Sequence, residues 1–148
     1  MSMFTAFNIN ASGMTAQRYR MDIIAENVAN TSTTRTADGT PYRRKVVTFQ
    51  EKSSSPTSFN WVLKREKDNY TGKGVKVSSV QEDTWTPEKL VYDPSHPDAD
   101  ENGYVTLPNV NIVTEMTNLI DASRSYEANS TAFTASKSMA LKGLEIAQ

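Results

Sequence analysis

Apolar residues recur at helical spacing near the start of the chain. Most of them stand seven residues apart, and one more lies beside the same stripe; they are Phe7, Met14, Met21, Ile24 and Val28. This period is typical of an amphipathic helix that packs along a seam against a second helix. The pattern predicts a helix over residues 5–30, which ends where a run of Asn, Ser and Thr side chains competes for backbone hydrogen bonds.

A second, longer apolar stripe follows Pro108 and keeps the same seven-residue period. Its main members are Ile112, Met116, Leu119, Tyr126 and Phe133. Asn109 or Asn111 is placed to cap the first turn of this helix. About 36 residues at ~1.5 Å each form a rod of roughly 54 Å. Such a rod exceeds the diameter of a domain of this size, so much of it must contact something outside one globule.

The segment between the two helices has a different sequence pattern, in which short stretches rich in β-forming residues are separated by Pro, Gly and Ser. Strands are predicted at residues 45–50, 61–65, 75–82, 89–92 and 104–107. The predicted fold is therefore α+β, in which two long amphipathic terminal helices form a coiled-coil-like core around a small inserted β-rich module. The expected divisions are residues 1–33 and 108–148 for the axial core and residues 34–107 for the outer module and its linkers.

Composition and charge narrow the classes of function. Of the 148 residues, 37% are hydrophobic, and Ser, Thr and Asn are plentiful, so part of the chain is expected to need a partner to bury it. The net charge of −1 creates no field that would attract nucleic acid or an anionic membrane. No apolar run reaches the length needed to span a bilayer, so direct membrane insertion is not expected. The absence of cysteine excludes disulfides and thiolate metal sites.

One acidic segment partly resembles a calcium-binding loop. Asp98, Asp100, Asn102 and Gly103 match the spacing of the first ligands and the turn glycine of an EF-hand. Asn109 stands where that loop requires a bidentate carboxylate, which weakens the match. An acidic turn in which Gly103 adopts a positive φ is the better interpretation. A periplasmic or extracellular calcium-dependent binding module stays open as the alternative function.

No pattern in the chain predicts catalysis. His96 is the single histidine, and no G-x-S-x-G sequence supplies a nucleophile that could pair with it. The sequence therefore predicts no enzyme, no cofactor and no metal site. Tyr126 and Phe133 are open to two interpretations, because they can pack within one chain or between neighbouring subunits.

Two separated motifs carry a specific resemblance to a known family. They are AENVANTST at residues 25–33 and YDPSHPDADENGYVTLPNVN at residues 92–111, the latter followed by EMTNLIDASRSYEAN. In this order they resemble the bacterial flagellar basal-body rod proteins, and the length and spacing are most similar to the proximal rod members. The matching residues are Asn27, Val28, Ala29, Asn30, Tyr92, Pro94, Gly103, Tyr104, Pro108 and Asn109. Where related rod and hook proteins commonly have a Gly-Phe-Lys turn, this chain has TRTADGTPYRRK.

The resemblance implies a structural subunit of a helical tube. In this family the terminal helices form the inner core of the tube, which transmits torque and encloses an export channel, while the β-rich middle lies outside. The implied partners are copies of the chain itself, other rod proteins, the MS ring with its adapter proteins, and the flagellar type III export apparatus. The start of the chain has no basic segment followed by an apolar one, which agrees with export across the periplasm without a cleaved signal peptide.

Overall fold

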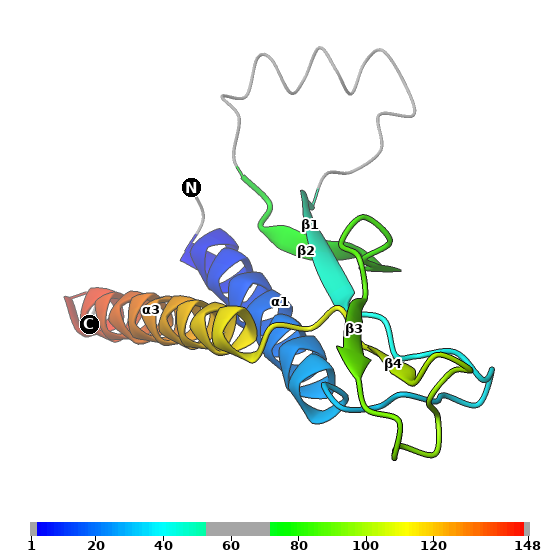
Figure 1. Ribbon diagram of the computed structural model, residues 1–148. Helices are drawn as coiled ribbons and strands as arrows, with labels where there is room; N and C mark the ends of the chain where they lie inside the picture. The colour runs from blue at the N-terminus through cyan, green and yellow to red at the C-terminus, as the bar shows by residue number, and fades with distance from the viewer. Residues whose placement is uncertain (1–2, 53–71, 147–148) are drawn as a thin grey trace, which may run out of the picture.

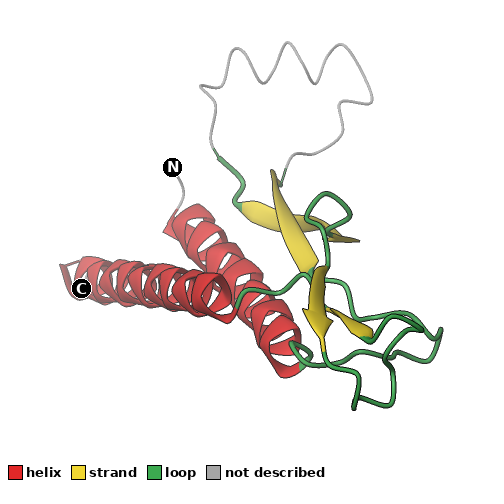
Figure 2. Ribbon diagram, viewed as in Figure 1, coloured by secondary structure: helices red, strands yellow, loops and turns green. Residues whose placement is uncertain are grey.

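The structure, a computed structural model, describes residues 3–52 and 72–146 of the chain. Its elements are, in order, α1 (Met3–Ala29), β1 (Lys45–Glu51), β2 (Val75–Glu82), β3 (Lys89–Tyr92), β4 (Tyr104–Leu107) and α3 (Ile112–Ile146). The two helices lie against each other and the strands lie to one side of them (Figures 1 and 2). This arrangement confirms the predicted α+β class. The predicted strand at residues 61–65 lies outside the described residues.

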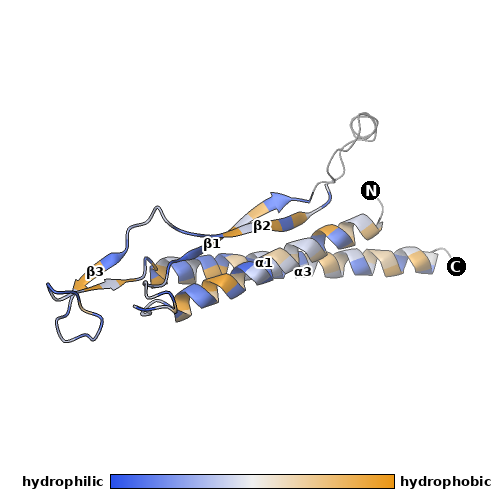
Figure 3. Cartoon of the chain, turned by 90° about the vertical axis from the view of Figure 1, so that its right-hand side faces the viewer, coloured by the Kyte–Doolittle hydropathy of each residue, from blue (hydrophilic) through white to orange (hydrophobic). Residues whose placement is uncertain are grey.

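The two helices run antiparallel. Phe7 near the start of α1 meets Phe133 in the second half of α3, with ring centroids 5.0 Å apart in an edge-to-face contact. At the other end Asn27 bonds to Glu115 in the first turn of α3. The start of α1 and the end of α3 therefore lie at one end of the pair, and β3 extends beyond the other end (Figure 3).

Polar side chains define the helix boundaries. Thr31 Oγ1 donates to the carbonyl of Val28, and Asn30 Nδ2 donates to that of Glu26, which ends α1 as predicted. Asn111 caps α3, because its Oδ1 accepts hydrogen bonds from the amides of Val113 and Thr114 at 3.0 and 3.3 Å. Asn109, the other candidate for this role, is buried and bonded elsewhere.

The described strands form two separate two-stranded sheets. β1 pairs antiparallel with β2, and the register shifts between Thr48 and Phe49. β3 pairs antiparallel with β4, which places Tyr92 opposite Tyr104. β3 and β4 are close in the sequence, whereas the partners in the β1–β2 pair stand further apart, as Lys45 opposite Glu82 shows. Local alternation was sufficient to locate these strands, but it carried no information about which of them would pair.

Small and polar side chains also face the helix seam, beside residues of the predicted apolar stripe such as Phe7 and Phe133. Gly13 of α1 is buried against Asn129 of α3, and a Cβ added at Gly13 would lie 2.7 Å from Asn129 Oδ1. Glu115 and Ala122 are buried at 1% and 0% exposure, one heptad apart. The most deeply buried positions of α3 are therefore small or polar, and the larger apolar residues lie beside them. Neither described helix is long and apolar enough to cross a membrane.

Candidate subunit-packing site

A cluster of polar side chains, most of them buried, connects the helix pair to the strands. We call it the polar joint and define it as Asn27, Tyr42, Arg44, Asn109 and Glu115. Its members come from the end of α1, the segment that enters β1, the segment before α3 and the first turn of α3. Burying polar groups is costly unless each is hydrogen-bonded, so the quality of this network decides whether the joint is rigid.

Asn27 is completely buried and uses all of its hydrogen-bonding capacity. Its Oδ1 accepts from the Tyr42 hydroxyl and from the Lys45 amide, both at 2.9 Å. Its Nδ2 donates to the Lys45 carbonyl at 2.9 Å and to Glu115 Oε2 at 3.0 Å. A side-chain amide offers two donors and two acceptor lone pairs. Asn27 therefore fixes the end of α1 to both β1 and α3.

The buried carboxylate of Glu115 is neutralised by Arg44. Arg44 Nε and one terminal guanidinium nitrogen both lie 2.8 Å from Glu115 Oε1. The other terminal nitrogen lies 3.5 Å from Asp83 Oδ2. A buried charge without a partner is strongly destabilising, so this pair makes the position of α3 depend on the segment that enters β1.

Asn109 completes the connection to β2. Its Oδ1 accepts from the Arg44 amide at 2.8 Å, and its Nδ2 donates to the carbonyls of Asp83 at 2.8 Å and Thr86 at 3.2 Å. Asn27 and Asn109 were singled out by family resemblance, and the structure gives both a physical role. Arg44 and Glu115 were missed as a pair, because their separation of 71 residues leaves no local pattern.

The environment of the joint shifts two ionisable groups. Burial, together with the negative charges of Glu26, Glu115 and Glu82, raises the pKa of Tyr42 to about 12. The Tyr42 hydroxyl therefore stays protonated at neutral pH and donates to Asn27. Hydrogen bonds from the side chain and backbone of Thr86 are the main cause that lowers the pKa of Asp83, which thus stays ionised beside Arg44.

The predicted packing residues fall into two groups. Ile24 is buried within the chain, and six others are half-buried at the margin of the helix seam: Phe7, Met14, Met21, Val28, Leu119 and Phe133. Ile112 and Met116, in contrast, are 47% and 55% exposed, and Tyr126 is 36% exposed. The first group contributes to the contact between the helices, and the second is uncovered in the isolated chain.

The uncovered apolar side chains of α3 gather on one side near its start. We call this the outer face of α3 and define it as Val113, Met116 and Ile120, which are 74%, 55% and 55% exposed. At 100° per residue these positions lie on the side of α3 away from Glu115 and Ala122. Apolar residues are spread along both helices (Figure 3). Contiguous exposed apolar surface marks an interaction site.

The last turns of α3 carry a further set of exposed apolar residues. Met139, Leu141 and Leu144 are 68%, 52% and 63% exposed. These turns lie beyond the Phe7–Phe133 contact, where α1 is close to its own beginning. They therefore form an extension of the helix pair that the described part of the chain leaves largely uncovered.

The acidic segment folds as a turn. Gly103 has a φ of +79°, as predicted, and a Cβ there would lie 3.0 Å from the Tyr92 ring. Asp100 Oδ1 accepts from the amides of Asn102 and Tyr104, so this oxygen supports the turn itself. Within residues 3–52 and 72–146, no three His, Cys, Asp or Glu side chains gather to hold a metal ion.

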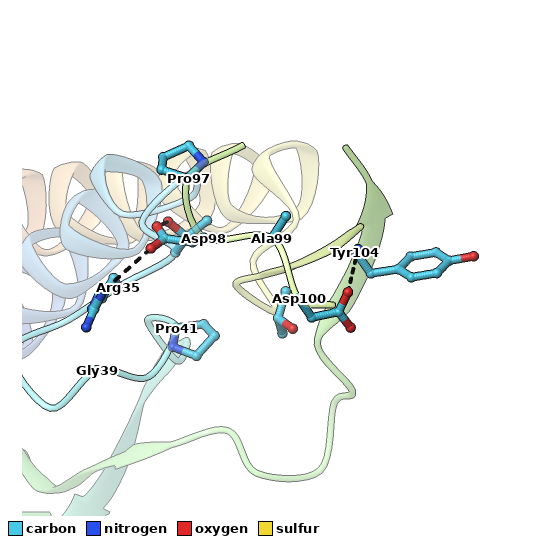
Figure 4. Close-up of a pocket in the computed structure, with 10 residues that line it drawn as sticks. Arg35, Gly39, Pro41, Pro97, Asp98, Ala99, Asp100 and Tyr104 are labelled. Carbon is cyan, nitrogen blue, oxygen red and sulfur yellow. Dashed lines mark hydrogen bonds and ion pairs between the residues drawn. The ribbon is translucent and has the colours of Figure 1, made fainter. Parts of the chain in front are cut away.

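An open cleft lies beside this turn. It has a volume of about 360 Å³ and separates residues 34–41 from residues 97–106. Asp98 is one of the residues that line it. Its Oδ2 accepts from Thr34 Oγ1 at 2.8 Å and its Oδ1 lies 3.8 Å from Arg35, while the ring of Tyr104 points away from the other labelled residues (Figure 4). The polar groups of Asp98 are therefore occupied by the chain itself.

Comparison with known proteins gives consistent matches over the whole chain. Residues 7–35 match the family model described as flagella basal body rod protein, and residues 101–146 match that of the flagellar basal body rod FlgEFG protein C-terminal region. The flagellar basal-body rod protein FlgC of Borreliella burgdorferi is 47% identical, over 100% of this chain and 99% of the relative. The FlgC proteins of Bacillus subtilis and Salmonella typhimurium are 45% and 43% identical, over 99% and 100% of both chains.

Proposed function

Because this chain belongs to the flagellar basal-body rod protein family and is a structural subunit of the rod, we propose that it polymerises through its two terminal helices. The polymer forms the drive shaft that transmits torque and encloses the export channel. The observation that carries the proposal is the apolar surface of α3, where the outer face and the last turns are exposed in the isolated chain. A helical filament requires repeated contacts between unlike surfaces, and this surface is available for them.

The proposed arrangement assigns residues 1–33 and 108–148 to an inner helical layer of the shaft. Residues 34–107 then form the outer module, which the polar joint holds at a fixed orientation to the helices. The shaft crosses the periplasm at the basal body, and the subunit reaches it through the flagellar type III export apparatus without a cleaved signal peptide. Its neighbours are copies of itself and other rod proteins, and its base contacts the MS ring and adapter proteins.

The alternative of a calcium-dependent binding module receives no support. The named relatives that align over the whole chain are rod proteins. The acidic segment on which the alternative rests uses Asp100 Oδ1 and Asp98 Oδ2 for contacts within the chain. As a member of a family of structural proteins, the chain is assigned no catalytic role.

Substitution at the exposed end of α3 tests the proposal. Leu144 is 63% exposed, so Leu144→Asp is expected to leave the fold of the purified chain unchanged, as measured by circular dichroism. In cells that produce this variant as their sole copy, we expect loss of swimming and no rods in isolated basal bodies, because a charge would be buried at every repeated contact. The control Lys76→Asp places the same side chain on exposed β2 and is expected to preserve motility. Normal rods with Leu144→Asp would refute packing through the terminal helices.

A further inference from the structure

The turn that links β3 to β4 contains a position where glycine is required. Gly103 has a φ of +79°, in the left-handed region that side chains disfavour. A Cβ added there would also lie 3.0 Å from the Tyr92 ring and 3.1 Å from Cβ of Pro94. The residue before this glycine is Asn102, which is exposed. The fold therefore keeps a glycine directly after an exposed asparagine.

An asparagine followed by glycine can react with its own backbone. The amide nitrogen of Gly103 attacks Cγ of the Asn102 side chain and forms a C–N bond that closes a succinimide ring. The side-chain nitrogen of Asn102 leaves with the displaced proton as ammonia, and water then opens the ring to aspartate or isoaspartate. Glycine favours this attack because it has no Cβ to hinder the close approach of its backbone. Water is the only co-reactant that this modification requires.

Asp100 restrains the reacting nitrogen and the residues on either side of it. The amide of Gly103, which is the nucleophile, donates to the Asp100 carbonyl at 3.0 Å. Oδ1 of the Asp100 side chain accepts from the amides of Asn102 at 2.9 Å and Tyr104 at 2.8 Å (Figure 4). The Gly103 nitrogen must leave its hydrogen bond to reach the Asn102 side chain, so the turn has to open locally first. A carboxylate that accepts from backbone amides opposes this opening.

A second turn of the chain has the same backbone arrangement without this side-chain support. In residues 36–40, Gly39 also has a φ of +79°, and its amide donates to the Thr36 carbonyl at 3.0 Å. The Thr36 amide donates to the Thr40 carbonyl at 2.8 Å, and the corresponding bond in residues 100–104 is 2.9 Å long. The amides on either side of Gly39 donate to no side chain of the described residues, and Thr36 Oγ1 donates to the Thr40 carbonyl instead. The two turns thus differ in the support that Asp100 supplies.

We propose that Asn102 is a site of spontaneous deamidation, which the Asp100 side chain protects in the folded chain. Unfolding, or loss of that side chain, frees the Gly103 nitrogen to react. Either product adds a negative charge beside Asp100 and Glu101, and isoaspartate also adds a methylene group to the backbone inside the turn. The added length disturbs the bonds that close the β3–β4 hairpin. This protection belongs to the folded chain itself, so it does not depend on the contacts proposed for the shaft.

Incubation of purified full-length chains at neutral pH, followed by peptide mass spectrometry, measures the protection. Aspartate and isoaspartate at position 102 are followed over time in the native chain, in Asp100→Ala and in Asp100→Asn. Asp100→Ala is expected to react about tenfold faster than the native chain, because the lost hydrogen bonds make opening of the turn easier by roughly that factor. Asp100→Asn keeps a side-chain oxygen that can accept from both amides and is expected to react at nearly the native rate. Circular dichroism checks that the variants are folded.

The substitution Asp38→Asn supplies a matched control within the same molecule, because it places an asparagine before Gly39 in the unsupported turn. In the folded chain, position 38 is expected to deamidate faster than position 102, and the two rates should converge when the chain is unfolded in urea. Equal rates in the folded chain would overturn the protection, and this comparison decides even where Asp100→Ala does not fold. An unchanged rate in folded Asp100→Ala would also overturn it. No reaction at position 102 in urea would show that Asn102 is not a deamidation site.

Discussion

Replacing Arg44 with Met removes the cationic partner of a buried carboxylate while keeping most of the side-chain stem. Both guanidinium contacts to Glu115 Oε1 are 2.8 Å long, and the glutamate side chain is 1% exposed. The remaining donors to this carboxylate are the amides of Asn27 at 3.0 Å and Asn118 at 3.4 Å, and the second is long. Breaking a buried pair by removing one partner costs about 3–5 kcal/mol, so Arg44→Met is expected to lose this much free energy of unfolding.

The reverse substitution is expected to cost less. The side chain of Arg44 is 25% exposed and keeps Asp83 as a second partner, so the loss of the Glu115 charge leaves the guanidinium partly compensated. Glu115→Gln should therefore cost about 1.5–3 kcal/mol, the range for a hydrogen bond to a charged group. In the Arg44→Met background the same change removes the stranded charge. It is then expected to raise stability, although it lowers stability in the native chain.

Urea unfolding of the purified chains, followed by far-ultraviolet circular dichroism, measures these differences. With a slope of about 2 kcal/mol per M, Arg44→Met should lower the midpoint by about 2 M. Arg43→Met is the matched control, because the Arg43–Glu88 pair is 2.9 Å long but solvent-accessible and such pairs contribute about 0–1 kcal/mol. A double variant Arg44→Met/Glu115→Gln that unfolds at the same or a lower urea concentration than Arg44→Met would refute the stranded-charge explanation.

Three further variants test other features of the chain. The pKa of Tyr42 is about 12 in the folded chain and 10.0 in the unfolded chain, so the free energy of unfolding should fall as the pH rises between these values. Urea midpoints measured at stepped pH should fall less in Tyr42→Phe, which has no proton to lose. In the native chain the new Cβ of Gly13→Ala would displace Asn129 Oδ1, so the substitution should be more stabilising in the Asn129→Ala background, by up to about 1 kcal/mol. If the effects of the two substitutions on the urea midpoint simply add, that contact is contradicted. Asn111→Ala should cost about 1 kcal/mol through loss of the α3 cap, and an unchanged thermal midpoint would count against the cap.

Local sequence patterns were sufficient for the elements whose contacts are local. The predicted strands at residues 75–82, 89–92 and 104–107 coincide with β2, β3 and β4, because alternation and turn residues specify a hairpin over a short stretch. The predicted helix after Pro108 corresponds to α3 (Ile112–Ile146), since a sustained apolar period with a proline before it defines a helix clearly. The sequence offers Asn109 and Asn111 as the N-terminal cap of α3. In the structure Asn111 caps the helix, because Asn109 is buried and bonded to other segments.

The buried polar residues in the seam between the helices could not be predicted in the same way. An apolar period identifies the hydrophobic side of a helix, and it therefore predicts the stripe that contains Ile112 and Met116. The side that faces α1 also carries buried Glu115 and Ala122, because small and paired polar residues allow the helices to meet at the joint and near Gly13. Glu115 looks like a surface residue until Arg44 and Asn27 are placed around it, and that placement depends on contacts 71 and 88 residues apart.

The uncovered last turns of α3 have a consequence for how a shaft of such subunits grows. From the Phe133 contact to Ile146, α3 continues for 13 residues, or roughly 20 Å, while α1 begins four residues before Phe7. One end of the helix pair is thus a bare apolar tip, and the other is a polar joint that carries the strands. Stacked head to tail, these subunits form a filament whose two ends differ chemically. Such a filament has a polarity, and an arriving subunit meets a different surface at each end.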